Sequence, residues 1–358
     1  MRLDFEEHII DIVETCSSRL GGALEVGTIR AIGSPAFKGR VADATQAFFV
    51  DGTSRDDDCV LILSNPQFPE MVVLDAEVSN STRSEKVKES DPGRFFEMFI
   101  AEQNMVGAAL GFSRRGAKPC VSSFAAFLTR AFDQIRMSQY SGMNALFVGS
   151  HAGVSIGYDG ASQMGLEDIA LFRSLRDSVV LYPSDAMSAQ ILIEQALLHT
   201  GITYIRTTRM KTPVLYSQNK AEKFTIGKCS VLKRSSNDSI TVVGAGVTLH
   251  SAVDAYKRLS QEGISLRVID LFSVKPLDVK TLKKAGKETG GIITVEDHYA
   301  AGGIGEAVSA ALSDTAIPVT SLSVEKEPRS GSPEEVMDHC GISVDAIIKE
   351  VRRRLKEK

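Results

Sequence analysis

The stretch NALFVGSHAGVSIGYDGASQMGLED, residues 144–168, decides the fold class because it joins an apolar run to a long, Gly-rich loop. The run at 144–150 is apolar at successive positions, which is typical of a strand buried on both faces. Such strands occur in parallel sheets that helices cover, so the stretch predicts an α/β protein. Its Gly-rich loop then lies at the carboxyl edge of the sheet, where α/β proteins bind ligands.

The same rhythm of apolar strands and amphipathic helices extends from this stretch in both directions. Before residue 216 it predicts strands at 71–78, 118–124, 178–184 and 202–207, and helices at 95–110, 125–140 and 186–198. After a polar linker or edge hairpin at 216–228, it predicts strands at 239–246, 265–271, 291–298 and 317–324, and a basic C-terminal helix from residue 344. We therefore expect two doubly wound, mainly parallel-sheet α/β domains, at 53–222 and 223–358, after an N-terminal extension at 1–52.

Composition and charge exclude several classes of protein. The 358 residues carry a net charge of −4, which gives no electrostatic case for binding nucleic acid or an anionic membrane. No apolar run is long enough to span a bilayer, and the acidic N-terminus lacks the basic start of a signal peptide. The five cysteines are scattered, which fits buried thiols in a reducing, cytoplasmic setting better than disulfides or a zinc site.

Several loops after the predicted strands carry side chains suited to ligand binding. His151 and Asp159 lie in the Gly-rich loop, Arg206 and Arg209 lie at the end of the strand at 202–207, and hydroxyl groups and an arginine occur at 79–83. Because the carboxyl ends of parallel strands meet at one edge, we expect these side chains to share a surface. Arginine and hydroxyl groups together are the chemistry for holding a phosphate.

Glu102 places a carboxylate inside the apolar run FIAEQNMVGAALGF, residues 99–112. In a helix drawn over 95–110, Glu102 sits on or beside the apolar stripe. A buried carboxylate is costly unless it is paired or hydrogen-bonded. Either Glu102 lies at the helix edge and reaches water, as most helical glutamates do, or it meets a specific partner.

Four motifs occur in an order that resembles a known family: IAEQNMVGAALGFSRRG, SSFAAFLTRAFDQIRM, GSHAGVSIGYDGASQMGLEDIALFRSL and YPSD. Together they resemble the pyrimidine-binding domain of transketolases, which are thiamine diphosphate enzymes. The later motifs VIDLFSVKPLD and VEDHYAAGGIGEAV resemble the C-terminal domain of the same family. The resemblance implies transfer of a two-carbon ketol unit from a ketose phosphate to an aldose phosphate, in the pentose phosphate pathway.

The resemblance also implies a cofactor site. Glu102 matches the glutamate that hydrogen-bonds N1′ of the aminopyrimidine, and so assists its change of tautomer. Phe124 and Phe127 match the aromatic pocket around that ring. Arg130 stands at a third position of the pocket, where some transketolases have an aromatic residue. Glu77 stands near the cofactor, where the family usually has aspartate.

Other positions match the family's substrate-binding residues. His151 matches the histidine that contacts the hydroxyl groups of the substrate, which makes it the second catalytic candidate after Glu102. Asp159 matches the residue that recognises the C2 hydroxyl of the acceptor. Ser81, Arg209 and Arg55 match the groups that hold the sugar phosphate.

The chain lacks one part of the family's cofactor site. Transketolases bind the diphosphate through Mg²⁺ with a G-D-G motif in an N-terminal half, and this sequence contains no G-D-G. The resemblance therefore implies the C-terminal subunit of a split enzyme. A partner polypeptide supplies the diphosphate-binding domain and the metal ligands, and an α2β2 assembly closes each site. We assign no metal ligand to this chain.

Two other interpretations remain open. The first is another thiamine diphosphate enzyme of the same architecture. A 1-deoxyxylulose-5-phosphate synthase usually has D-R-A-G where this chain has SHAG, and 2-oxo acid dehydrogenase beta subunits lack SQMGLED. The second is a non-catalytic scaffold subunit, which predicts loss of the catalytic glutamate or the aromatic pocket. Glu102, Phe124 and Phe127 are all retained.

Overall fold

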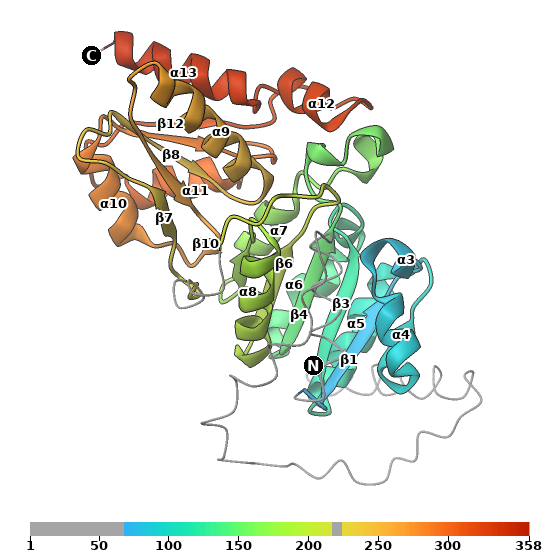
Figure 1. The fold of residues 1–358 in the computed structure, drawn as a ribbon. Helices are drawn as coiled ribbons and strands as arrows, with labels where there is room; N and C mark the ends of the chain where they lie inside the picture. Colours follow the sequence, from blue (N-terminus) through green and yellow to red (C-terminus); the bar gives the residue numbers. More distant parts are fainter. Residues whose placement is uncertain (1–67, 217–223, 358) are drawn as a thin grey trace.

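Two β-sheets organise the part of the chain that the structure describes, residues 68–216 and 224–357, in this computed structural model. In Figure 1 most of the first sheet, in blue to yellow-green, lies below the second, in yellow to orange. The predicted extension at 1–52 and the candidate Arg55 lie outside the described residues. Two mainly parallel α/β units confirm the predicted fold class.

The first sheet has seven strands in the order β10-β5-β6-β4-β3-β1-β2, all parallel except for the pair β10–β5. Its strands are β1 (Met71–Asp75), β2 (Phe95–Glu97), β3 (Lys118–Phe124), β4 (Ala145–Ser150), β5 (Val179–Leu181), β6 (Ile202–Arg206) and β10 (Ser273–Lys275). The α-helices and 3₁₀ helices (η) of this unit are α3 (Ser79–Thr82), α4 (Glu85–Ser90), η1 (Pro92–Arg94), α5 (Glu102–Arg114), η2 (Phe127–Ala131), α6 (Phe132–Tyr140), η3 (Val154–Asp159), η4 (Ala161–Gln163), α7 (Asp168–Ser174) and α8 (Ala186–Leu198).

The second sheet has five strands in the order β12-β11-β8-β9-β7, parallel except for the pair β7–β9. Its strands are β7 (Ser230–Lys233), β8 (Ile240–Gly244), β9 (Leu266–Asp270), β11 (Ile292–Val295) and β12 (Val319–Leu322). Its helices are α9 (Val247–Gln261), α10 (Val279–Glu288), α11 (Ile304–Ala311), α12 (Pro333–His339) and α13 (Val344–Lys356).

Each face of the first sheet carries its own hydrophobic core. Leu146 and Val148 of β4 pack in the cluster that includes α8. Ala145 and Phe147, which point to the opposite face, pack in the cluster that includes α5, α6 and α7. That second cluster continues into β8, β9 and β11, so a single apolar core joins the two sheets. Burial of large side chains such as Phe147 stabilises each face by about 1.5–3 kcal/mol per residue.

The strand β10 departs from the expected division of the chain. Residues 273–275 follow β9 of the second sheet, yet they pair with β5 of the first, with Ser273 opposite Leu181. Just beyond this pair, the N–H of Tyr182 donates to the carbonyl of Phe272 at 2.8 Å. The sequence prediction assigned 273–275 to the second unit alone, because a three-residue strand has no period of its own.

The predicted helix over 95–110 is wrong over residues 95–101, about its first two turns. Phe95–Glu97 form the edge strand β2, which pairs with β1, and the helix α5 begins only at Glu102. Phe99 has a positive φ of 55°, and Phe99 and Ile100 are exposed. The apolar residues at 95–98 imitate a helical stripe, but pairing with β1 determines their conformation.

The predicted helix over 125–140 also begins later than expected. Phe124 is the last residue of β3, Phe127 opens the 3₁₀ helix η2, and α6 begins at Phe132. The helix predicted at 186–198 is confirmed in full by α8, which Asp185 caps by accepting a hydrogen bond from the N–H of Ser188. Of the hairpin or linker predicted at 216–228, residues 217–223 lie outside the described ranges, and 224–228 form no strand.

Candidate active site at the carboxyl edge of the first sheet

Four neighbouring strands, β6, β4, β3 and β1, run parallel and end at the same edge of the first sheet. The loops that follow them contain the candidates Arg209, His151, Phe127 and Ser81. The topology therefore gathers, at one edge, residues that are up to about 130 positions apart in the sequence.

Glu102 is buried and paired, which answers the question that its apolar surroundings raise. It is the first residue of α5, its side chain is 5% exposed, and its Oε2 lies 2.9 Å from Nη1 of Arg130. The N-terminal end of a helix carries a partial positive charge, which favours a carboxylate there. The interpretation of Glu102 as a water-exposed residue at a helix edge is therefore wrong.

An aromatic pair lies at the same edge of the sheet as Glu102. The rings of Phe124 and Phe127 stack with their centroids 5.0 Å apart and their planes 13° apart. Phe127 and Arg130 lie three positions apart in η2, and residues at that spacing share one face of a 3₁₀ helix. Arg130, which binds Glu102, therefore lies on the same side of η2 as the half-buried Phe127.

His151 adds a third ring to the stacked pair of Phe124 and Phe127. Its ring stacks on Phe124, with centroids 3.9 Å apart and planes 10° apart, and its Nδ1 lies 3.0 Å from Oγ of Ser150. Its φ of 54° is left-handed, which turns the chain sharply at the end of β4. Burial, and then the nearby Arg209 guanidinium, lower the pKa of His151 to about 4, so its imidazole is neutral at pH 7.

Arg209 and Asp159, both predicted to bind substrate, form an ion pair. Nη1 of Arg209 lies 2.6 Å from Oδ1 of Asp159, and the Arg209 side chain is 54% exposed. A pair with this exposure contributes only about 0–1 kcal/mol. An incoming phosphate can therefore take over the guanidinium at little cost.

Ser81 lies on a loop that a buried carboxylate organises. Asp75 ends β1 with no exposed surface, and it accepts hydrogen bonds from the hydroxyls of Thr82 (2.7 Å) and Ser84 (2.8 Å). Burial raises the pKa of Asp75 to about 6. Ser81 is half-buried in the short helix α3, which Asp75 anchors through the hydroxyl of Thr82. The sequence prediction missed Asp75, although an acidic residue at the end of the apolar run MVVLD was a signal.

Glu77 lies at the same end of β1 but is exposed. Its φ is 61°, and its backbone N–H donates to Oε1 of Glu97 at 2.9 Å. Glu97 also accepts from the N–H of Phe99 at 3.2 Å, so one carboxylate bridges the loop of Glu77 and the turn before α5. The side chain of Glu77 itself faces solvent.

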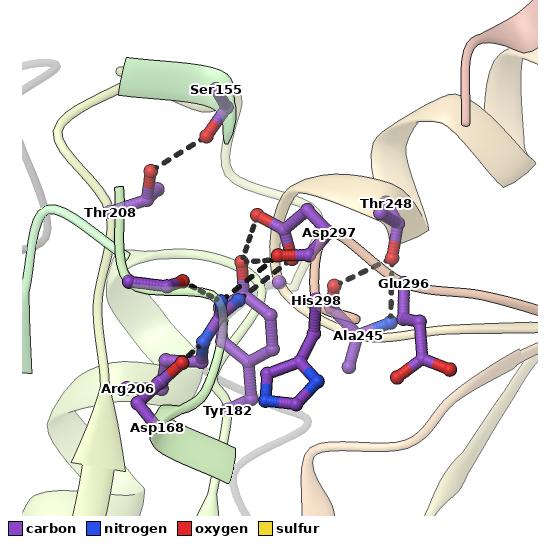
Figure 2. Close-up of polar contacts among 12 residues, drawn as sticks. Ser155, Asp168, Tyr182, Arg206, Thr208, Ala245, Thr248, Glu296, Asp297 and His298 are labelled. Carbon is purple, nitrogen blue, oxygen red and sulfur yellow. Dashed lines mark hydrogen bonds and ion pairs between the residues drawn. The ribbon is translucent and has the colours of Figure 1, made fainter. Parts of the chain in front are cut away.

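The expectation that Arg206 joins Arg209 on a phosphate-binding surface is wrong. Figure 2 shows Arg206 enclosed between the carboxylates of Asp168 and Asp297. Its side chain has no exposed surface, with Nε 2.8 Å from Asp168 and Nη1 2.7 Å from Asp297. Burial alone would raise the pKa of Asp168, but Arg206, His298 and the hydroxyl of Tyr204 hold it below its ordinary range.

Metal-ligand clusters, cysteines and long apolar helices were sought among the described residues. Within residues 68–216 and 224–357, no group of three or more His, Cys, Asp or Glu side chains could hold a metal ion. Cys120, Cys229 and Cys340, the cysteines of the described ranges, are free. None of the helices described is both long and apolar enough to cross a membrane.

Comparison with known proteins assigns both units to one family. Residues 60–214 match the model of the transketolase pyrimidine-binding domain, and residues 227–347 match that of the transketolase C-terminal domain. Transketolase-like protein 2 of Mus musculus is 55% identical over 79% of this chain and 45% of its own length. Transketolase of Homo sapiens is 49% identical over the same shares. The chain thus spans about half the length of these curated relatives.

A solved structure matches over nearly its whole length. It is described as a split gene transketolase, an inactive beta4 tetramer, and it is 33% identical, with a TM-score of 0.76. The match covers 86% of this chain and 99% of that one. With the two domain matches, this shows that the chain belongs to the transketolase family, of which it contains the pyrimidine-binding and C-terminal domains.

Proposed function

We propose that this chain is the C-terminal subunit of a split, thiamine diphosphate-dependent transketolase that transfers a two-carbon ketol unit between sugar phosphates of the pentose phosphate pathway. The observation that carries the proposal is the buried Glu102 carboxylate at the start of α5, paired with Arg130 of η2, the same short helix that contains Phe127 of the stacked pair. It lies at the sheet edge where α/β proteins bind ligands.

Glu102 and the two phenylalanines have the chemistry that an aminopyrimidine requires. The ring nitrogen N1′ needs a carboxyl group within hydrogen-bonding reach, and the ring faces need apolar surface. Glu102 supplies the carboxyl group, and the half-buried Phe127, backed by Phe124, supplies an aromatic face. When bound, thiamine diphosphate supplies the nucleophilic carbon at which the carbon–carbon bond is broken and formed.

In this proposal Glu102 holds a proton in common with N1′ and so controls the tautomer of the ring. Arg130 fixes the carboxylate through Oε2 at 2.9 Å, and we assign the other oxygen, Oε1, to the ring. The low exposure of Glu102 keeps water from competing for that hydrogen bond. Glu77, at the end of β1, completes the chain's cofactor-binding group.

The substrate lies along the remainder of the edge in this proposal. His151 is neutral at pH 7, and Ser150 contacts Nδ1, so Nε2 is the atom that hydrogen-bonds a sugar hydroxyl. Asp159 accepts from the C2 hydroxyl of the acceptor. Arg209, with Ser81 and Arg55, binds the phosphate, because a guanidinium and hydroxyl groups donate strong hydrogen bonds to it.

We place the diphosphate site and the Mg²⁺ ligands on a partner subunit with a G-D-G motif, in an α2β2 assembly. The split gene transketolase supports this placement, because this chain matches 99% of its length and its beta4 tetramer is described as inactive. A chain of this kind then requires its partner for activity.

The test is a paired assay with thiamine diphosphate, Mg²⁺, xylulose 5-phosphate and ribose 5-phosphate. This chain, the candidate partner and their mixture are each measured for two-carbon transfer and for association. We expect transfer only in the mixture. Cofactor binding without transfer would indicate another thiamine diphosphate enzyme, of the synthase or 2-oxo acid dehydrogenase type. An associated complex that binds no cofactor would indicate a scaffold subunit.

A further inference from the structure

Asp297 belongs to the second unit but is buried against the first. It follows β11, and its side chain is 1% exposed. Tyr182 Oη lies 3.1 Å from both of its carboxylate oxygens, and Arg206 Nη1 lies 2.7 Å from Oδ1. Arg206 Nη2 also donates to its backbone carbonyl at 3.0 Å. Figure 2 shows these donors of the first unit converging on one residue of the second.

Asp297 also supports the loop that carries His151. Gly153 has a φ of +80°, and a Cβ atom on it would lie 1.8 Å from Oδ2 of Asp297. The N–H of Gly153 donates to the carbonyl of Gly165 at 2.8 Å, and Arg206 Nη2 donates to the same carbonyl at 2.9 Å. The His151 loop therefore rests directly on the Asp297 carboxylate.

Arg206 opens the segment that leads to Arg209, and this segment is bonded to the His151 loop at successive positions. The bonds are Thr207 N–H to Gly149 O (2.9 Å), Ala152 N–H to Thr207 O (3.0 Å), Thr208 Oγ1 with Ser155 Oγ (2.9 Å, Figure 2) and Arg209 Nη1 to Asp159 Oδ1 (2.6 Å). The two segments therefore form one unit, anchored at Arg206 and Gly153.

Charge neutralisation alone does not account for Asp297. Asp168 already places a carboxylate oxygen 2.8 Å from Nε of Arg206, so the guanidinium has a counter-ion within the first unit. A second buried carboxylate is costly. Asp297 fixes the orientation of Arg206, and its carboxylate packs closely against the loop at Gly153.

We propose that Asp297 is a positioning residue for the sugar-phosphate site: through Arg206 and Gly153 it sets how Arg209 lies relative to the His151 loop. The C-terminal unit thus contributes to substrate recognition without touching the substrate. This proposal rests on the proposed roles of Arg209 and His151 in substrate binding.

The test compares Asp297→Asn with Asp314→Asn, the same change at a 68% exposed aspartate of the same unit. In the reconstituted enzyme, we expect Asp297→Asn to raise the KM for ribose 5-phosphate about tenfold. We expect its kcat, and its kcat/KM for unphosphorylated ribose, to change by less than about threefold. Asp314→Asn should match the unchanged protein. Equal losses with ribose and ribose 5-phosphate would overturn the proposal.

A second measurement compares the unchanged chain with Asp297→Asn, both without cofactor or partner. Hydrogen–deuterium exchange at 151–166 and 207–209 should be about tenfold faster in Asp297→Asn, with β3 and β4 unchanged. Should Asp297→Asn not fold, Tyr182→Phe removes only a hydroxyl that donates to Asp297 and should show a smaller effect of the same direction. Unchanged exchange in these loops would refute the positioning role.

The two readouts separate this proposal from the proposed function. Faster loop exchange with no transfer activity in any mixture would retain the anchoring by Asp297 but reject the sugar-phosphate role. Normal activity in the unchanged protein, with neither KM nor exchange altered in the variant, would reject the positioning role alone.

Discussion

Glu102 and Asp297 are both buried carboxylates that bind an arginine, yet their surroundings differ in one respect. The partner of Glu102 is Arg130, whose side chain is 55% exposed, whereas the partner of Asp297 is Arg206, which has no exposed surface. Tyr182 also donates to Asp297. A carboxylate with an exposed partner borders a surface that a ligand can reach, but one enclosed by buried donors touches no ligand and acts only through the groups that it holds in place.

The substitution Glu102→Gln should have the largest effect and tests the accessible member of this comparison. Glutamine keeps the shape but cannot exchange a proton with the ring, so kcat should fall by about 10²- to 10⁴-fold. The decisive measurement is exchange of the C2 proton of bound thiamine diphosphate in the reconstituted enzyme. Glu89→Gln, on the exposed side of α4, is the matched control. Exchange at a near-normal rate in Glu102→Gln would remove the proposed role.

The substitution Arg206→Met tests the enclosed member by stability. It leaves two buried carboxylates without their shared guanidinium, so the free energy of unfolding should fall by about 3–5 kcal/mol. Arg130→Met removes a partly exposed partner, and the loss should stay near 1 kcal/mol. Chemical denaturation of both variants measures the two losses in the free energy of unfolding. Similar losses would show that the two sites differ less than their exposure indicates.

The substitution Arg209→Ala sharpens the comparison on the substrate side. A charge-assisted contact to phosphate contributes about 1.5–3 kcal/mol, so the KM for phosphorylated sugars should rise about 10- to 150-fold. Cofactor binding should not change. Arg176→Ala, at an 87% exposed arginine, provides the control in the same steady-state assay. A KM equal to that of the control would place the phosphate site elsewhere.

A smaller effect is expected from the titration of His151. Its pKa is about 4 in the folded chain and 6.5 in the unfolded chain, so the unfolded state binds more protons between these values. Stability is therefore complete above pH 6.5 and decreases as the pH falls, by about 2 kcal/mol at pH 5.

Denaturation curves at pH 6.5 and 5.0 check this slope in the unchanged chain and in His151→Asn. The variant should lose less stability on acidification, although it retains the contribution of His298, whose pKa burial also lowers to about 4. An identical slope in both proteins would mean that His151 titrates alike in the folded and unfolded states.

Periodicity in the sequence was sufficient for the alternating architecture and for α8, because these depend on local patterns of apolar residues. It failed at β2 and β10, three-residue strands whose conformation depends on pairing with distant segments. Phe124 ends β3, as the strand predicted at 118–124 requires, whereas Phe127 opens the 3₁₀ helix η2 and not the α-helix predicted over 125–140.

Arg206 and Arg209 show most clearly what could not be predicted from the sequence. Arg206 and Arg209 lie three positions apart with the same side chain, and nothing local distinguishes them. What makes Arg206 structural is Asp297, 91 positions away in the other unit. The sequence did contain a partial signal, because two acidic residues, Glu296 and Asp297, follow the apolar run at 291–295. Which arginine Asp297 would meet depended on how the two units pack.

The strand β10 has a consequence for any attempt to dissect this protein. A fragment cut near residue 222 would lose residues 273–275 and leave the unpaired backbone of β5 at the margin of its sheet. Exposed margins of this kind recruit strands from other copies, so such a fragment should aggregate rather than behave as a soluble module. Engineered fusions or domain exchanges therefore have to keep both units in one polypeptide.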